Sequence, residues 1–464
     1  MDLLIKNCLA VDPVSGVKSS SVAVRDGTIV SVGKDIRLRK TREIDARGAY
    51  LLPAFIDNHS HADLSILHEK EHPSLKQGIF TLVTGNCGLG IFPYPGEEWF
   101  SLWKPVFGDY PHPRLSKGIR YRDLYGEAKA EVLPLIPYNT LRYAFFRGRE
   151  RIDGSGKRKI FSFLKENLPL FRGLSLGLGY PPGSYMDKNE LEQIFSIVSK
   201  KKKYVAVHIR DEGEGIIESL REVITPAVRA GCRLMISHFK TYGKNSWKKM
   251  PDAIEEVEKA SRRIEIGFDL YPYDFGSTTL YSLLPQRIQR LGRDGVFRKI
   301  RRDEVKMDEP YVGWENILLI GAGKYDHRDI REIARTEGRN ESAVFFSILL
   351  QTEGEAGMLI QAMDEKNVIE LLKHPLSRLG SDSLFGRPRH PRTDAAFTRF
   401  LFHYVRQKKI LSIVEATKKL SYNAALWLGL KKGRIAPGFK ADLLLADWKK
   451  GKLLRKMRGG KIVS

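Results

Sequence analysis

The segment Tyr50-Leu51-Leu52-Pro53-Ala54-Phe55-Ile56-Asp57 is an apolar run of strand length that leads directly into His59-Ser60-His61. Side chains alternate between the two faces of a strand, so His59 and His61 would share one face and could contact one ion. A pair of this kind on its own is more often structural than metal-binding. Its meaning depends on the residues at the ends of the other strand-like runs in the chain.

Four further strand-like runs lead to residues of the same kind, namely Cys87, His208, His238 and Asp382. Imidazole and thiolate are suitable ligands for zinc, and a catalytic zinc site keeps one position open for water. Barrel enzymes place their chemistry at the carboxyl ends of the strands. A lone cysteine or histidine at such a place is most often a packed structural residue. The whole set in this order, however, predicts one metal site at the mouth of a barrel.

The order of the predicted elements indicates the fold class. From about residue 53 to 432, strand-length apolar runs alternate with helical patterns; Val205-Ala206-Val207, for example, precedes apolar residues at helical spacing in 214–224. This alternation favours a parallel sheet, and we predict an α/β fold with a closed (β/α)8 TIM-like barrel. A densely charged stretch from Leu284 to Asn316 interrupts the alternation and predicts a small cap insertion near 284–345.

Both ends of the chain are predicted to be rich in β-strands. Short alternating strands with turns such as Asp26-Gly27 occupy the first fifty residues, and similar patterns return in 441–446 and 460–463. We expect residues 1–52 and 433–464 to form one small, discontinuous β-sandwich, which would flank the barrel of residues 53–432.

Composition narrows the class of protein. The chain has 464 residues and a net charge of +23, with 42% hydrophobic and 29% charged residues, which is typical of a globular chain with a large core. The basic residues are spread along the chain without a nucleic-acid-binding motif, so we expect no nucleic-acid partner. No apolar run approaches the roughly 20 residues of a membrane span, no secretory leader is visible, and the cysteines number three. We expect a cytoplasmic protein with no membrane partner.

In its motifs the chain resembles the N-acyl-D-amino-acid deacylases (D-aminoacylases) of the amidohydrolase superfamily. The resemblance extends over essentially the whole chain, and its most discriminating elements are Asn86-Cys87-Gly88 and Tyr180-Pro181-Pro182-Gly183. Further matching motifs are Phe55-Ile56-Asp57-Asn58-His59-Ser60-His61, His208-Ile209-Arg210-Asp211-Glu212-Gly213, Ile236-Ser237-His238-Phe239-Lys240, Gly380-Ser381-Asp382 and His390-Pro391-Arg392.

This resemblance implies a metal site and a reaction. A tightly bound zinc ion would lie on Cys87, His208 and His238, and a second, weaker metal on His59, His61 and Asp382, with Cys87 able to bridge them. The enzyme would cleave the amide bond of an N-acyl-D-amino acid by metal-activated hydroxide, giving a carboxylate and a free D-amino acid. Asp382 would act as general base and then as general acid.

The resemblance also implies a binding site for the α-carboxylate of a small N-acylated amino acid. A carboxylate favours a planar, bidentate donor, and Arg392 would supply it. The other residues around the substrate would be Tyr180, Lys240, Tyr271, Ser277 and Thr278. Without the motif, Arg392 would be interpreted as an ordinary surface arginine and Tyr180 as a packed core aromatic.

The sequence leaves three alternative functions open. A cyclic-amide hydrolase of the hydantoinase or dihydroorotase kind is disfavoured. Such enzymes usually bridge their metals with a carboxylated lysine, whereas the family that this chain resembles uses a cysteine in that role. A D-specific dipeptidase-like enzyme is excluded by no residue. A non-catalytic basic binding protein on the same fold is disfavoured by the complete set of candidate ligands, since a barrel that had lost activity should have lost at least one of them.

Overall fold

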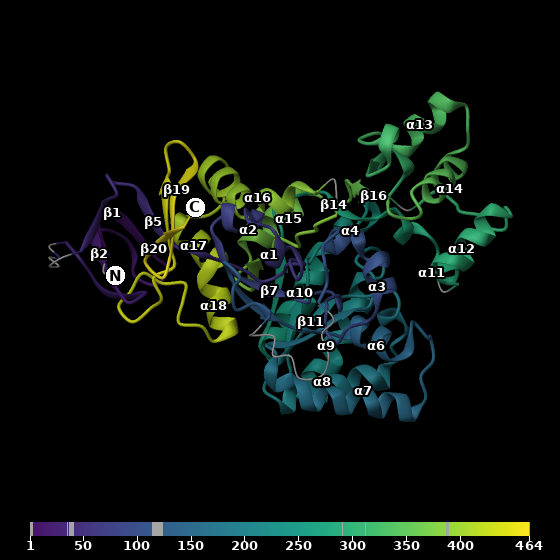
Figure 1. The fold of residues 1–464 in the computed structure, drawn as a ribbon, viewed down its shortest axis with the longest axis horizontal. Helices are drawn as coiled ribbons and strands as arrows, with labels where there is room; N and C mark the ends of the chain where they lie inside the picture. The colour runs from purple at the N-terminus through teal and green to yellow at the C-terminus, as the bar shows by residue number, and fades with distance from the viewer. Residues whose placement is uncertain are drawn as a thin grey trace.

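The computed structural model describes residues 3–34, 36, 41–113, 124–289, 291–310, 312–386 and 389–463. The described residues form a central barrel, a β domain built from both ends of the chain, and a cap that projects from the barrel (Figure 1). Each of these parts encloses an apolar core of its own.

The barrel consists of parallel strands that pair in chain order. β6, β7 and β8 form one ladder, and β9 to β13 followed by β17 form the next. Only Leu135 separates β8 from β9, and a parallel bridge between Ser60 and Ser383 joins the segments that follow β6 and β17. The strands are β6 (Phe55–Asp57), β7 (Ile79–Thr84), β8 (Glu131–Pro134), β9 (Ile136–Pro137), β10 (Gly173–Gly177), β11 (Tyr204–His208), β12 (Arg233–Ile236), β13 (Ile266–Leu270) and β17 (Ser377–Leu379). The predicted α/β barrel is confirmed.

Helices connect the strands and cover the outside of the barrel, and local sequence sets their ends. Asp187 begins α8 by accepting a hydrogen bond from the backbone N–H of Glu190 at 2.8 Å, and Gly231 ends α9 in the left-handed conformation. The helical spacing noted in 214–224 lies largely within α9. The helices around the barrel are α1 (Ser65–His68), α2 (Pro73–Lys76), α3 (Glu97–Leu102), α4 (Lys104–Phe107), α6 (Tyr138–Phe146), α7 (Gly154–Asn167), α8 (Lys188–Lys200), α9 (Ile216–Ala230), α10 (Met250–Ser261), α15 (Glu365–Lys373), α16 (Pro391–Arg399), α17 (Ile413–Thr417) and α18 (Asn423–Leu428).

The β domain joins the two ends of the chain in one eight-stranded sheet. Strand β5 pairs in parallel with β1 and antiparallel with β18, so that Leu52 lies opposite Leu444. The order of the strands is β20-β19-β18-β5-β1-β2-β3, with β4 also paired to β1. They are β1 (Leu3–Asp12), β2 (Gly16–Arg25), β3 (Thr28–Gly33), β4 (Arg42–Asp45), β5 (Tyr50–Pro53), β18 (Leu443–Asp447), β19 (Lys452–Arg458) and β20 (Lys461–Val463).

The cap is inserted between barrel strands β13 and β17. Its centre is an antiparallel sheet in which β16 pairs with both β14 and β15. Its elements are β14 (Gly276–Thr279), α11 (Gln286–Gln289), α12 (Gly292–Arg301), β15 (Ile317–Ile320), α13 (Ile330–Glu337), α14 (Glu341–Gln351) and β16 (Gly357–Ile360). In the described part of the chain, no helix has the length and apolar character needed to cross a membrane.

Candidate metal centre

The six candidate ligands gather where the barrel strands end. His59 and His61 follow β6, Cys87 follows β7, and His208 is the last residue of β11; the other two, His238 and Asp382, follow β12 and β17. All are buried except His208, which is half-buried. They form two groups that share Cys87, namely His59, His61, Cys87 and Asp382, and Cys87, His208 and His238, and within each group the ligand atoms lie within 4.8 Å of one another.

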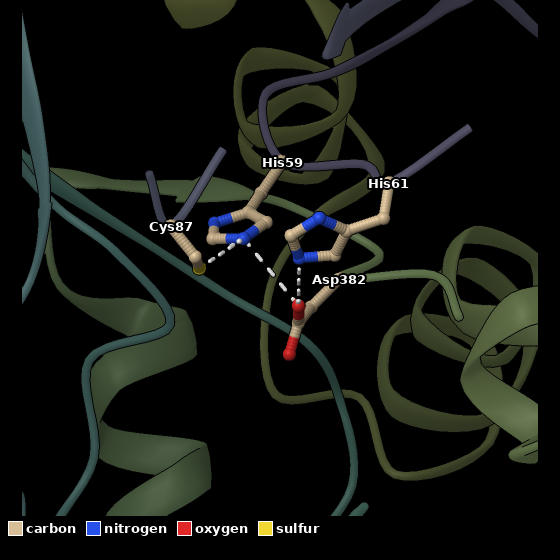
Figure 2. Close-up of side chains that lie close together, drawn as sticks. All are labelled: His59, His61, Cys87 and Asp382. Carbon is tan, nitrogen blue, oxygen red and sulfur yellow. Dashed lines mark hydrogen bonds and ion pairs between the residues drawn. The ribbon is translucent and has the colours of Figure 1, made fainter. Parts of the chain in front are cut away.

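The first group surrounds the Asp382 carboxylate and the Cys87 sulfur (Figure 2). The Nε2 atoms of His59 and His61 lie 3.4 Å and 3.3 Å from Asp382 Oδ1, and His59 Nε2 also lies 3.2 Å from Cys87 Sγ. All four side chains therefore point toward one small volume.

The second group shares the same sulfur. His238 Nε2 is 3.4 Å from Cys87 Sγ and 2.8 Å from His208 Nδ1. Cys87 thus belongs to both groups, as a bridging ligand would.

Three of these residues have a backbone conformation that side chains disfavour. The φ angles of Cys87, His238 and Asp382 are 54°, 36° and 46°, in the left-handed region that non-glycine residues rarely adopt. Such conformations cost about 1–3 kcal/mol each and cluster at functional sites. The chain therefore holds these side chains in place at the expense of local backbone stability.

Two carboxylates that the sequence analysis did not select orient the histidines. Asp269 Oδ1 lies 3.0 Å from His59 Nδ1, and it accepts a hydrogen bond from the backbone nitrogen of His238 at 2.8 Å. Glu212 Oε1 lies 2.8 Å from His238 Nδ1. With Nδ1 of each ring occupied, Nε2 of His59 and of His238 faces the centre, as in metal sites where a carboxylate fixes the ring orientation.

A signal for both carboxylates is present in the sequence. Asp269 is a charged residue within the otherwise apolar β13, and a buried carboxylate in a strand calls for a partner. Glu212 belongs to the motif that begins at His208, but the motif alone does not say which ring it contacts.

The charges at the centre favour the ionised forms of the thiol and of the carboxyl group. Burial would raise the pKa of Cys87, but His59 and His238 lower it well below its usual value. Burial would also raise the pKa of Asp382, and here Arg392 and His61 hold it well below its usual range. A thiolate and a carboxylate are the forms that bind metal.

A cavity of about 750 Å³ opens onto this centre. It is lined by five of the candidate ligands, His61, Cys87, His208, His238 and Asp382, and by all six residues predicted around the substrate: Tyr180, Lys240, Tyr271, Ser277, Thr278 and Arg392. His59, fully buried, lies behind the lining. The structure thus brings every predicted site residue to one place.

Three of the predicted substrate residues already have partners in the chain. Arg392 Nη2 lies 2.9 Å from Asp382 Oδ2, with its guanidinium 4.6 Å from the centre of the Tyr271 ring. Lys240 Nζ donates to Glu212 at 2.6 Å. The hydroxyl of Tyr180 donates to the backbone carbonyl of Cys87 at 2.5 Å, so it supports the turn that carries the thiol.

The donor set fits a metal ion of the zinc type. One thiolate, four imidazoles and one carboxylate are ligands that zinc accepts, and two of the imidazoles are oriented by buried carboxylates. A strand-end cluster of this composition beside a large cavity is the arrangement of a metal-dependent barrel enzyme.

Comparison with known proteins gives consistent results. Models of the amidohydrolase family match residues 42–124 and 362–463. An N-acyl-D-aspartate deacylase of Alcaligenes xylosoxydans xylosoxydans is 28% identical over 459 residues, covering 96% of this chain and 86% of the relative. An N-acyl-D-glutamate deacylase of the same organism is 27% identical over 462 residues, covering 96% and 87%.

A solved structure has the same fold. The crystal structure of N-acyl-D-glutamate deacylase from Bordetella bronchiseptica, complexed with zinc and a phosphonate inhibitor, has a TM-score of 0.83 at 24% identity and covers 100% of this chain and 96% of that chain. The fold and the site thus place this protein among the metal-dependent amidohydrolases. Along nearly its whole length the chain is similar to N-acyl-D-amino-acid deacylases, which confirms the resemblance seen in the motifs.

Proposed function

We propose that this chain is a zinc-dependent hydrolase that cleaves the amide bond of an N-acyl-D-amino acid to a carboxylate and a free D-amino acid. One observation carries the proposal: Asp382 contacts the His59–His61 pair through one carboxylate oxygen and Arg392 through the other, at the edge of the cavity. A single carboxylate thereby connects the metal ligands with a cation suited to the substrate.

Asp382 is the group that moves the proton in this proposal. Zinc, when bound, supplies polarisation of the amide carbonyl and lowers the pKa of water toward about 7. The ionised Asp382 accepts the proton that water loses as its oxygen bonds to the carbonyl carbon. The carboxyl then passes this proton to the amide nitrogen as the C–N bond breaks, so it acts as base and acid in turn.

Arg392 is the candidate partner of the substrate's α-carboxylate. Its Nη2 contacts Asp382, whereas its buried Nε has no hydrogen-bond partner among the residues that the structure describes. A guanidinium carries five N–H donors, so this side chain can serve a second carboxylate while it keeps Asp382 in place. Lys240, which contacts Glu212 and His238, adds a second positive charge to the same cavity.

The experiment that tests the function is hydrolysis of paired N-acetyl-D- and N-acetyl-L-amino acids with ninhydrin detection, with and without added zinc. The wild type is compared with Asp382→Asn and with Asp394→Asn, which removes an exposed carboxylate of α16. Zinc-dependent release of the free amino acid from D substrates supports the proposal if Asp382→Asn abolishes the release and Asp394→Asn does not.

Other outcomes separate the alternatives. No release from either enantiomer, with zinc demonstrably bound, would overturn simple deacylation, and D-dipeptides and cyclic amides would then discriminate between the two other hydrolases. Inactivity toward all of these substrates would favour a binding protein. Equal release from both enantiomers would overturn the D preference alone.

The proposal includes a cytoplasmic location and a small-molecule substrate as the partner of the site. The three cysteines, Cys8, Cys87 and Cys232, are all free and buried, which fits a reducing compartment.

A further inference from the structure

A second cavity, of about 570 Å³, lies at the opposite end of the barrel from the metal centre. It is lined by residues of β8 and by 169–172 and Lys203, which precede β10 and β11. Residues 169–172 and Lys203 lie at the amino ends of β10 and β11, whereas the candidate metal ligands lie at the carboxyl ends of the strands. The cavity therefore takes no part in the chemistry proposed above.

Four cationic side chains from four separate segments line this cavity. Arg172 and Lys203 come from the barrel, and Lys440 and Arg458 come from the β domain. Two of them are fixed by backbone carbonyls, because Lys203 Nζ donates to the carbonyl of Phe171 at 2.7 Å and Arg458 Nη1 donates to that of Ala128 at 3.1 Å. The cations are thus held at the junction of the two parts.

The nearby carboxylates do not balance these cations. Glu131 is the one carboxylate among the described lining residues, and Lys432 Nζ lies 2.6 Å from it and 3.0 Å from Asp442. Lys440 Nζ lies 3.9 Å from Asp442. Among the residues that the structure describes, and counting Lys432 and Asp442, five cations face two carboxylates, which leaves an excess of positive charge around a concave space.

Burial and, to a smaller extent, neighbouring positive charges lower the pKa of two of these lysines. Burial and the neighbouring Arg172 lower the pKa of Lys203. Burial lowers the pKa of Lys440 and so do Lys432 and Arg458, although Asp442 and Glu131 oppose them. An anion in the cavity would remove this repulsion.

We propose that this cavity binds a small organic phosphate ester that carries two or more negative charges. Guanidinium groups match phosphate oxygens in a bidentate manner, and lysines add point charges, so Arg172, Arg458, Lys203 and Lys440 can engage separate oxygens. The remaining lining is largely apolar, including Leu170, which is 65% exposed. A ligand with a carbon body between or beside its phosphates fits both features.

The test is isothermal titration calorimetry of the zinc-loaded, full-length protein with fructose 1,6-bisphosphate at fixed ionic strength. Inorganic phosphate serves as the comparison, because it offers a single phosphate group and no carbon body. The double variant Arg172→Gln/Lys440→Gln removes one cation from each side of the cavity. The matched control, Arg335→Gln/Lys366→Gln, removes two exposed cations elsewhere.

We expect saturable binding of the bisphosphate to the wild type, weaker binding of inorganic phosphate, and a loss of at least about tenfold in affinity in the cavity variant. The control variant should bind as the wild type does. Unchanged hydrolysis without bisphosphate would show that the cavity variant is folded. Equal titrations for the wild type and the cavity variant, or no saturable binding to the wild type, would overturn the proposal; neither outcome bears on the deacylase function.

Discussion

Asp269→Asn should weaken metal binding at the barrel mouth although it removes no ligand. One oxygen of Asp269 lies 3.0 Å from His59 Nδ1 and 2.8 Å from the backbone nitrogen of His238, so it orients ligands of both groups. Asparagine keeps the shape and an acceptor oxygen but loses the charge. Loss of such a partner lowers metal affinity by about 10- to 100-fold, which corresponds to about 1.4–2.7 kcal/mol. Because one carboxylate serves two ligands, we expect the upper part of this range.

The assay is competition for zinc with a chromophoric chelator. The matched control is Asp329→Asn, since Asp329 begins α13 in the cap by accepting from the backbone N–H of Glu332, and asparagine caps helices equally well. Thermal unfolding of both variants checks that they are folded. A zinc affinity of Asp269→Asn within twofold of the wild type would refute the argument that this carboxylate orients the imidazoles.

Three further predictions concern the proton carrier, the thiols and a buried lysine. Asp382→Asn should lower kcat by about 10²- to 10⁴-fold while zinc stays bound to Cys87, His208 and His238. Loss of all zinc together with activity would contradict a role of Asp382 in proton transfer. Burial raises the pKa of Cys8 to about 11 and that of Cys232 to about 12. After zinc is chelated, iodoacetamide at pH 8 should therefore label Cys87 alone. Label found by mass spectrometry on Cys8 or Cys232 of the folded protein would disprove this prediction. Burial lowers the pKa of Lys419 from its ordinary value of 10.5 to about 8. Between these two pH values, Lys419 carries a proton in the unfolded chain but has lost it in the folded protein. The free energy of unfolding should therefore rise with pH in that window, and Lys419 should contribute up to about 1.4 kcal/mol per pH unit to this rise. Urea titrations at pH 8 and 10 should give a smaller rise for Lys419→Met than for the wild type. An equal rise in both proteins would refute the prediction.

The barrel and its ligand residues were predictable because their signals are local. A strand buried on both faces is a short apolar run, and the residue that ends it or comes just after it lies at the carboxyl end of the sheet, as His208 and Cys87 do. The predicted residues around the substrate lie in loops at the same end, so they too reach one cavity. The family resemblance assigned roles that spacing alone could not.

The contacts between distant segments were not predictable in the same way. Asp269 reaches His59 across 210 positions of the chain, and the polar residue within β13 shows that a partner is needed without showing which one. Arg392 was predicted to bind the substrate's carboxylate, but its contact with Asp382 was not predicted. The basic cavity joins four segments that are far apart in sequence, and no local pattern marks it.

The pairing of β5 with β18 has a consequence for synthesis of the chain. Pro53 lies opposite Leu443, so the partner of this strand is made about 390 residues later. At about 5–20 residues per second, the edge of β5 waits on the order of 20 to 80 seconds on the ribosome. An unpaired strand edge is a template for pairing with another chain. The yield of folded protein in a cell should therefore depend on translation speed and on chaperones that shield this edge, more than on the equilibrium stability of the finished fold.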